Sequence, residues 1–262
     1  MSPIRFSCNE GVEVRVLLVN DDGIDAEGLL SLERALESFD TWTVAPADPS
    51  SGISQALGLR RRIAIRRVGD RRWAVEGTPT DCVKLALGRI LGDSPPQVVV
   101  SGINRGANTA NNVFYSGTVA AATEAAFWGF PALAVSVEYA EREPDFDRAA
   151  NVARRMLEEG LVESLPPHSV LNVNVPELYD EDPLRYAWTR TARFGRDLPL
   201  VEVEPGGNVY VYDRLRPQES PDVKGTDLEA LADGLVSLSV LSTDRSATID
   251  PPPFDLFSEE SL

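Results

Sequence analysis

Residues 14–23 read VRVLLVNDDG, an apolar run of strand length that stops at a polar turn. Downstream, apolar side chains recur at helical spacing, at Leu29, Leu32, Leu36 and Phe39. A second strand-like run, residues 41–45, ends before Pro46. A strand, a helix and a strand within about 30 residues are typical of a βαβ unit. This unit predicts a parallel sheet with a right-handed crossover.

The alternation of strands and helices continues to residue 176. Two β-like segments that flank the turn residues Gly69-Asp70 predict a hairpin. The further strands are expected at residues 97–100, 132–137 and 170–175, and the helices from Thr78, at 116–128 and at 147–159. Several strands lack polar alternation, which is typical of a sheet covered on both faces. The predicted fold class is therefore α/β, with helices on both faces of the sheet.

The pattern changes after Pro176. Short strands, Gly206-Gly207 and acidic loops predict an appended β-rich region over about residues 177–225. A helix that opens at Gly225 and a late strand at 236–241 are expected to complete the core. The predicted organisation is an N-terminal extension (1–13), a core (14–176) and a C-terminal region (177–262).

The chain of 262 residues carries 41 acidic and 25 basic side chains, a net charge of −16. This excess argues against general nucleic-acid coating and against binding to an anionic membrane surface. Only two of the basic residues are lysines, and such a composition is typical of adaptation to high salt. Two cysteines provide no disulfide framework, and no apolar stretch approaches the roughly 18 residues of a membrane span. We expect a cytoplasmic protein without a signal peptide.

Three polar segments follow strands of the predicted sheet: residues 20–23, 50–52 and 101–104. Ligands of open parallel sheets bind beyond the carboxyl ends of the strands, so these segments are expected to converge. Asp21 and Asp22 repel each other unless a cation or a shared proton relieves them. Oxygen ligands suit Mg²⁺, Mn²⁺ or Ca²⁺, and Ser51 and Asn104 can add neutral oxygens. The alternative is a turn rich in aspartate without a metal.

Ser116-Gly117-Thr118 opens a helix of small residues. The free N–H groups at a helix start attract an anion, and the hydroxyls of Ser116 and Thr118 can bind the same oxygens. An ordinary serine N-cap is the alternative. Beside a metal, this helix start predicts metal-assisted phosphoester hydrolysis. Neither the dinucleotide-binding nor the Walker-type glycine motif occurs in the sequence.

Residues 60–72 hold seven arginines. The segment is either a phosphate- or RNA-binding strip or a solvated hairpin paired with acidic neighbours, and the acidic total favours the second interpretation. The single histidine, His168, follows two prolines. A single histidine argues against His-rich zinc sites and against a Ser-His-Asp triad, so we expect a structural role for His168.

The motifs together resemble those of the survival protein SurE family of 5′-nucleotidases. The similar segments occur in order from about residue 14 to 245. They are residues 17–23, 44–46 with 51–52, 77–83, 101–108, 115–122, 129–136, 171–176 and 225–227.

The resemblance implies a metal-dependent nucleoside monophosphate phosphatase with a Rossmann-like core. It implies one Mg²⁺ or Mn²⁺ per subunit, held by Asp21, Asp22, Ser51 and Asn104. It also implies phosphate contacts from Asn108, Ser116, Gly117 and Thr118. Similar proteins act on nucleoside 5′- and 3′-monophosphates and some on polyphosphate. They form dimers or tetramers through swapped C-terminal elements, so a homodimer or homotetramer is expected.

The mechanistic hypothesis assigns catalytic roles to Asp21, Asp22, Asn108 and Ser116. Asp21 either orients or deprotonates the attacking water. Some members carry a histidine in the late strand-loop, but residues 241–244 contain none. Two alternatives stay open: a nucleotide-binding module without turnover, and an RNA-directed nuclease that uses the arginine hairpin. No stable nucleic-acid partner is expected.

Overall fold

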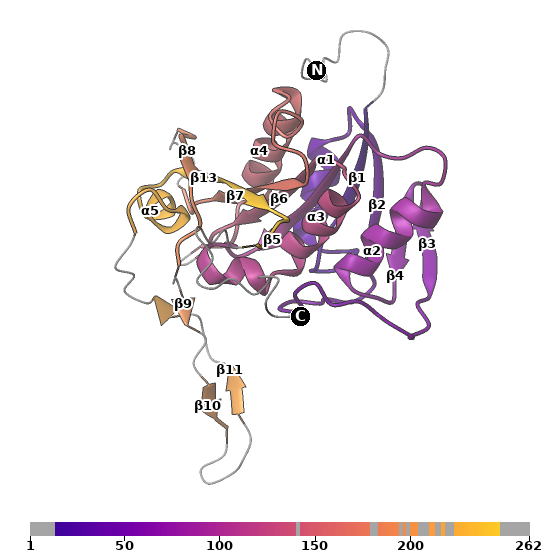
Figure 1. The fold of residues 1–262 in the computed structure, drawn as a ribbon, viewed down its shortest axis with the longest axis horizontal. Coiled ribbons are helices and arrows are strands. Elements are labelled where there is room, and N and C mark those ends of the chain that lie inside the picture. The colour runs from indigo at the N-terminus through magenta and orange to yellow at the C-terminus, as the bar shows by residue number, and fades with distance from the viewer. Residues whose placement is uncertain are drawn as a thin grey trace, which may run out of the picture.

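Strand β1 (Arg15–Val19) is an interior strand of a nine-stranded sheet (Figure 1). The structure is a computed structural model that describes residues 14–139, 142–178, 183–193, 196–197, 200–203, 210–212, 216–217 and 223–246. The other strands of this sheet are β2 (Asp40–Pro46), β3 (Ile65–Gly69), β4 (Arg72–Val75), β5 (Val98–Arg105), β6 (Ala132–Val137), β7 (Ser169–Val175), β8 (Tyr186–Thr189) and β13 (Val236–Ser242). Their order across the sheet is β3-β4-β2-β1-β5-β6-β7-β13-β8.

The six strands from β4 to β7 in this order are parallel, as the βαβ pattern predicts. Strand β3 pairs antiparallel with β4, which confirms the hairpin, and β13 pairs antiparallel with β7. The fold is therefore an α/β Rossmann-like core with antiparallel strands added at its edges.

Helices cover both faces of the sheet, as expected. They are α1 (Glu27–Ala35), α2 (Pro79–Leu85), α3 (Gly117–Phe127), α4 (Phe146–Glu158) and α5 (Asp227–Ala232), with a π-helix η1 (Ala86–Ile90) and a 3₁₀-helix η2 (Ala110–Phe114). Apolar side chains of α1 and α4 pack in one buried cluster, and those of α2 and α3 pack in another. The sheet separates these two clusters because alternate side chains of a strand point to opposite faces, as Leu17 and Leu18 do in β1.

The start of α1 lies directly on β5. A Cβ at Gly28 would stand 2.1 Å from the carbonyl oxygen of Ile103, so a larger residue would push the helix off the strand. Helix α2 begins as its sequence predicts, because Thr78 and Asp81 form a reciprocal capping box.

Two boundaries differ from the prediction. Residues 101–104 were expected in a loop, but β5 continues through them to Arg105. The pairing of β5 with β6 shifts register between Ser101 and Asn104 and then resumes, so the strand extends beyond Val100 to Arg105. The first β-like segment of the hairpin is expected over residues 60–68, but β3 begins at Ile65, so the arginines at 60–62 precede it.

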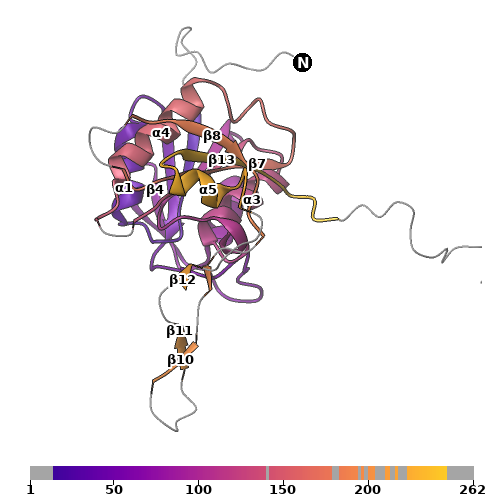
Figure 2. The same cartoon turned by 90° about the vertical axis from the view of Figure 1, so that its left-hand side faces the viewer.

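The C-terminal region contributes to the main sheet through β8, α5 and β13. Short strands also form two ribbons, β9 (Arg196–Asp197) with β12 (Arg216–Pro217), and β10 (Leu200–Glu202) with β11 (Tyr210–Tyr212). The β10–β11 ribbon stands away from the sheet in both views (Figures 1 and 2). The extension (1–13), Gly206-Gly207 and the tail after residue 246 lie outside the described residues. Within the described part of the chain, no helix is long and apolar enough to cross a membrane.

Candidate functional site

Asp21 joins three parts of the chain that are distant in sequence. It follows β1, and its residue is only 3% exposed. Its carboxylate accepts a hydrogen bond from the hydroxyl of Thr118 in α3. Its carbonyl oxygen accepts a 2.7 Å hydrogen bond from the N–H of Ser50, in the loop after β2. The ends of β1 and β2 and the start of α3 therefore meet at Asp21.

Both carboxyls of the Asp21-Asp22 pair resist ionisation. Burial, and to a smaller extent the charge of Asp22, raises the pKa of Asp21 from 3.8 to about 6. Burial also raises the pKa of Asp22, although the N–H and the charge of Arg105 partly offset it. Two adjacent carboxyls in this state fit a bound cation, because a positive charge would relieve both burial and repulsion.

Gly117 allows α3 to start directly against Asp21. A Cβ at Gly117 would lie 2.7 Å from the Cβ of Asp21 and 2.8 Å from its Oδ2. Such distances leave room for hydrogen alone. The positive end of the α3 dipole is thereby held against the carboxylate of Asp21.

Asn104 lies at the end of β5, beside Asp22. The side-chain amide of Asn104 donates to the carbonyl oxygen of Gly106 at 2.6 Å, and the N–H of Arg105 donates to Oδ2 of Asp22 at 3.3 Å. The carboxamide oxygen of Asn104 accepts no hydrogen bond among the described residues, so it is available as a ligand.

Ser51 is exposed and directly follows Ser50, whose N–H binds Asp21. The structure thus brings the segment of Ser51 to the main chain of Asp21 but gives the hydroxyl of Ser51 no hydrogen bond among the described residues. Across the described part of the chain, no group of three or more His, Cys, Asp or Glu side chains forms a metal site. A cation here depends on two carboxylates and neutral oxygens, which is the donor set of a hard metal ion.

Ser116 is the N-cap of α3, and its Oγ accepts the N–H of Val119 at 3.1 Å. The hydroxyl hydrogen of Ser116 is not used in this bond and can be donated to a ligand. The hydroxyl hydrogen of Thr118, predicted to contact phosphate, is donated to Asp21. Thr118 therefore positions the carboxylate in this arrangement. The main-chain N–H of Gly117, at the first helical position, has no partner within the helix.

Asn108 is held in a buried polar cluster whose other members were not predicted as site residues from the sequence. Its N–H donates to Oδ1 of Asn174 at 2.7 Å, and its side-chain amide donates to Ser136 at 2.8 Å. Its carbonyl oxygen accepts from the side-chain amides of Asn172 and Asn174 at 3.0 and 3.2 Å. The sequence did contain a signal, because two asparagines two residues apart in a buried strand lie on the same face.

Asp227 holds the segment between Asn108 and Ser116. Its buried carboxylate accepts N–H bonds from Ala110 at 2.8 Å, from Ala192 at 3.0 Å and from Leu228 at 2.9 Å. Ala110 has a positive φ of 49°, which a non-glycine residue adopts at a cost, so these bonds secure the start of η2. Asp227 is thus a positioning residue. In the sequence it stands out only as part of the segment 225–227, which indicates no role for its side chain.

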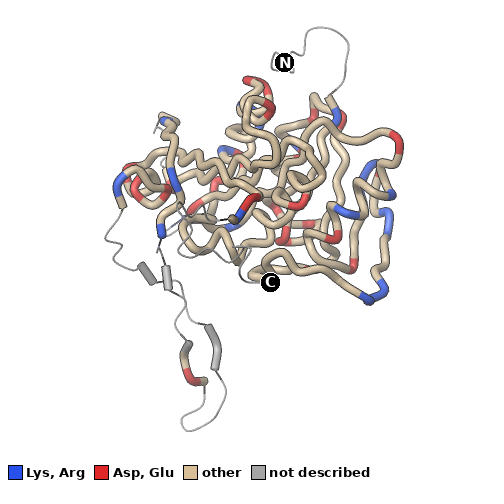
Figure 3. Tube along the Cα trace, in the orientation of Figure 1, with Lys and Arg blue, Asp and Glu red and all other residues tan. Residues whose placement is uncertain are grey.

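The seven arginines of residues 60–72 fall into a group with acidic partners and a group without them. Arg67, Arg71 and Arg72 form ion pairs with Asp70, Asp40 and Glu33, and Trp42 stacks on Trp73 between them at 5.3 Å. The other four are exposed and have no acidic partner among the described residues; they are Arg60, Arg61, Arg62 and Arg66. Figure 3 shows basic residues gathered along this edge of the sheet.

His168 lies at the opposite end of α3 from Asp21. Its Nδ1 is 2.9 Å from the carbonyl oxygen of Ala126, near the last turn of the helix. His168 therefore takes no part in the site around Asp21.

The burial of Asp21 predicts that Asp21→Asn stabilises the protein in the presence of a chelator. The pKa shift from 3.8 to about 6 lowers the free energy of unfolding by about 3 kcal/mol at a pH where Asp21 is ionised in both the folded and the unfolded protein. Because a carboxamide must also be desolvated, we expect a gain of about 2 kcal/mol at pH 7.5. As the pH falls through 6 the folded protein takes up the proton first, so the advantage of the variant shrinks.

Urea unfolding at pH 7.5 and pH 5 measures both effects. A variant that is less stable than the parent at pH 7.5, or an advantage that grows at pH 5, would contradict the assigned cost of burying Asp21.

The family model described as Survival protein SurE matches residues 16–196. The 5′-nucleotidase SurE of Methylocella silvestris is 41% identical over 242 residues, which cover 90% of this chain and 96% of that protein. The 5′-nucleotidase SurE of Bradyrhizobium diazoefficiens is 39% identical over 246 residues, which cover 89% and 95%.

A solved structure agrees with these matches. The crystal structure of the SurE protein from Aquifex aeolicus superposes with a TM-score of 0.78 at 32% identity, over 88% of this chain and 94% of that chain. The family model covers more than half of the chain, and the relatives match it over almost their full length. The chain therefore belongs to the survival protein SurE family.

Proposed function

We propose that this chain is a divalent-metal-dependent phosphatase that hydrolyses nucleoside 5′-monophosphates to nucleoside and phosphate. The observation that carries the proposal is the Asp21-Asp22 pair, in which Asp21 is buried and packs against the start of α3. A cation-binding carboxylate pair beside a helix N-terminus can stabilise the charge of a transferring phosphoryl group. The relatives named 5′-nucleotidase SurE support the same activity.

The donors at the site fit one Mg²⁺ or Mn²⁺ per subunit. Asp21 and Asp22 would supply two anionic oxygens, and Ser51 and Asn104 would supply neutral ones. When bound, the cation supplies positive charge for the phosphate oxygens and favours deprotonation of water. A hard cation with oxygen ligands also explains why two carboxyls whose pKa values are raised by burial stand side by side.

The other groups of the chain bind and orient the phosphate. The hydroxyl of Ser116 and the N–H of Gly117 donate to its oxygens, where negative charge increases in the transition state. Asn108 contributes its amide from the rigid cluster around Asn174. Asp21 orients or deprotonates the attacking water.

Phosphate release provides the direct test. We expect the full chain to release phosphate from AMP and GMP with Mn²⁺ or Mg²⁺, at a rate at least about 100-fold above that in the presence of a chelator. The panel includes 3′-AMP and polyphosphate, and each reaction is run in dilute buffer and in molar salt. Tight AMP binding without phosphate release would indicate the nucleotide-binding module. Cleavage of RNA alone would indicate a nuclease that uses the four exposed arginines.

We also propose a homodimer or homotetramer built through the C-terminal region. The β10–β11 ribbon stands away from the sheet, which suits contact with a second copy (Figure 2). We also propose a cytoplasmic location, because the chain has only two cysteines. The net charge of −16 supports the proposal that the protein is adapted to high salt.

A further inference from the structure

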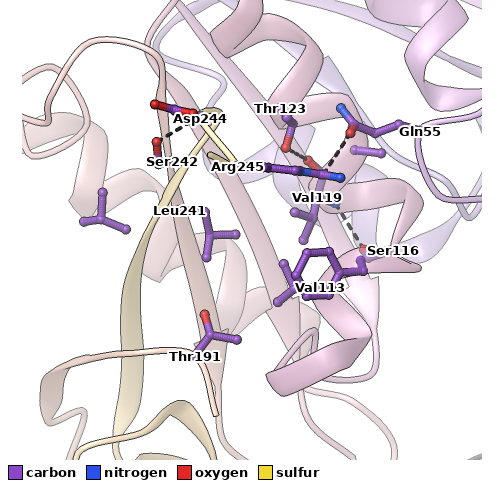
Figure 4. A pocket seen from close by; sticks show the side chains of 13 residues that line it. Gln55, Val113, Ser116, Val119, Thr123, Thr191, Leu241, Ser242, Asp244 and Arg245 are labelled. Carbon is purple, nitrogen blue, oxygen red and sulfur yellow. Dashed lines mark hydrogen bonds between the residues drawn. The ribbon is translucent and has the colours of Figure 1, made fainter. Parts of the chain in front are cut away.

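A cavity of about 450 Å³ adjoins the candidate phosphate site (Figure 4). Its walls come from the side of α3, from η2 and from the end of β13. Ser116 lines the cavity, so one end of it reaches the start of α3, where phosphate is proposed to bind. The Asp21-Asp22 pair lies outside it. The main apolar walls are Val113, Phe114, Val119 and Leu241.

Arg245 spans this cavity. Its guanidinium donates to Oε1 of Gln55 at 3.0 Å and lies 5.6 Å from the ring centre of Phe114. Figure 4 shows its side chain extending toward Gln55, whereas the side chain of Asp244, which also lines the cavity, extends away from Gln55. The carboxylate of Asp244 accepts the N–H of Ser246. Arg245 has no acidic partner among the described residues, so its charge is available to a ligand.

The cavity combines three properties that suit a nucleoside. Its volume lies within the range of small-molecule sites. Phe114 and the guanidinium plane of Arg245 offer surfaces on which a base can stack. Thr123, Gln55 and Arg245 provide polar groups at its edge, and a guanidinium donates hydrogen bonds to the oxygen and nitrogen acceptors of a base.

We propose that this cavity binds the nucleoside part of the substrate. In this proposal Arg245 is the residue that makes the enzyme prefer phosphate esters that carry a base. The proposal rests on the proposed phosphatase function, because Ser116 then contacts the phosphate of a molecule whose base lies beside Arg245. It also gives a role to the segment after β13, which carries Arg245. In an acidic protein, an unpaired cation at this point attracts an anionic ligand locally.

Steady-state kinetics of the full chain with Mn²⁺ test the proposal. In Arg245→Ala we expect KM for GMP and AMP to rise about tenfold, with kcat unchanged, because a stacked guanidinium and its hydrogen bond are lost. Glycerol 2-phosphate, which has no base, is expected to keep both constants. Gln55→Ala should change KM in the same direction but less. Arg66→Ala removes an exposed arginine on β3 at the far side of the sheet and serves as the charge-matched control.

Equal loss for nucleotides and glycerol 2-phosphate, or no change for either, would overturn the assignment of Arg245. A change in the oligomeric state of Arg245→Ala without a change in KM would also overturn it, because the residue would then serve an interface. Direct binding of guanosine, measured by calorimetry, separates this proposal from the proposed function. If the chain binds guanosine and Arg245→Ala weakens that binding about tenfold, the cavity assignment holds even where no phosphate is released.

Discussion

Asp22→Asn is expected to lower metal-dependent phosphate release from AMP about 1,000-fold or more, since it removes one of two charged ligands for the cation. The carboxamide has nearly the shape of the carboxylate and can still accept the N–H of Arg105. The fold should therefore persist, and the loss should appear in the rate and in the metal concentration required. Rates at increasing Mn²⁺ measure both quantities.

Asp25→Asn provides the matched control for this substitution. Asp25 lies three residues further along the same turn, its side chain is 85% exposed, and it pairs with Arg72 at the surface. An exposed ion pair of this kind contributes little, so we expect activity within about twofold of the parent. Full activity of Asp22→Asn that a chelator still abolishes would exclude Asp22 from the metal site.

Gly117→Ala is expected to lower the same rate about 100-fold, because misplacing a reacting group by about 1 Å costs this much. Alanine is the better helix former, so local propensity alone predicts a gain in stability. The new Cβ would stand 2.7 Å from the Cβ of Asp21, however, and neither atom belongs to a flexible side-chain end. Either Asp21 or the start of α3 has to move.

Gly88→Ala is the corresponding control, since the nearest atom to its new Cβ is a ring carbon of Trp128 at 3.9 Å. Circular dichroism and thermal melting of both variants show whether the fold is retained. A Gly117→Ala protein with parental activity and parental metal affinity would show that the close packing of α3 on Asp21 is not required.

The sequence was sufficient for features that depend on neighbouring residues. The apolar run before Asp21 predicts β1 because its length and termination are local properties. Ser116 predicts the start of α3, and Thr78 that of α2, because a cap bonds an N–H within three residues. The position of Asp21 and Asp22 in a turn directly after a buried strand is likewise a local property, so the sequence predicts it.

The site required contacts between residues far apart in the chain. Thr118 and Asp21 are 97 residues apart, and Asn108 and Asn174 are 66 apart. The predicted loop at 101–104 was wrong because pairing with β6 continues the strand, and the pattern within β5 alone does not reveal that pairing.

The sequence by itself determined the βαβ arrangement, the carboxylate pair and the capped helix start, since hydrogen bonding and burial within short segments govern these features. Only the tertiary structure decided that the hydroxyl of Thr118 binds Asp21, that asparagines of β7 hold Asn108, and that Arg245 spans a cavity beside Ser116. The physical reason is that each of these depends on which strands and helices pack together, and packing brings side chains into contact irrespective of their distance in the sequence.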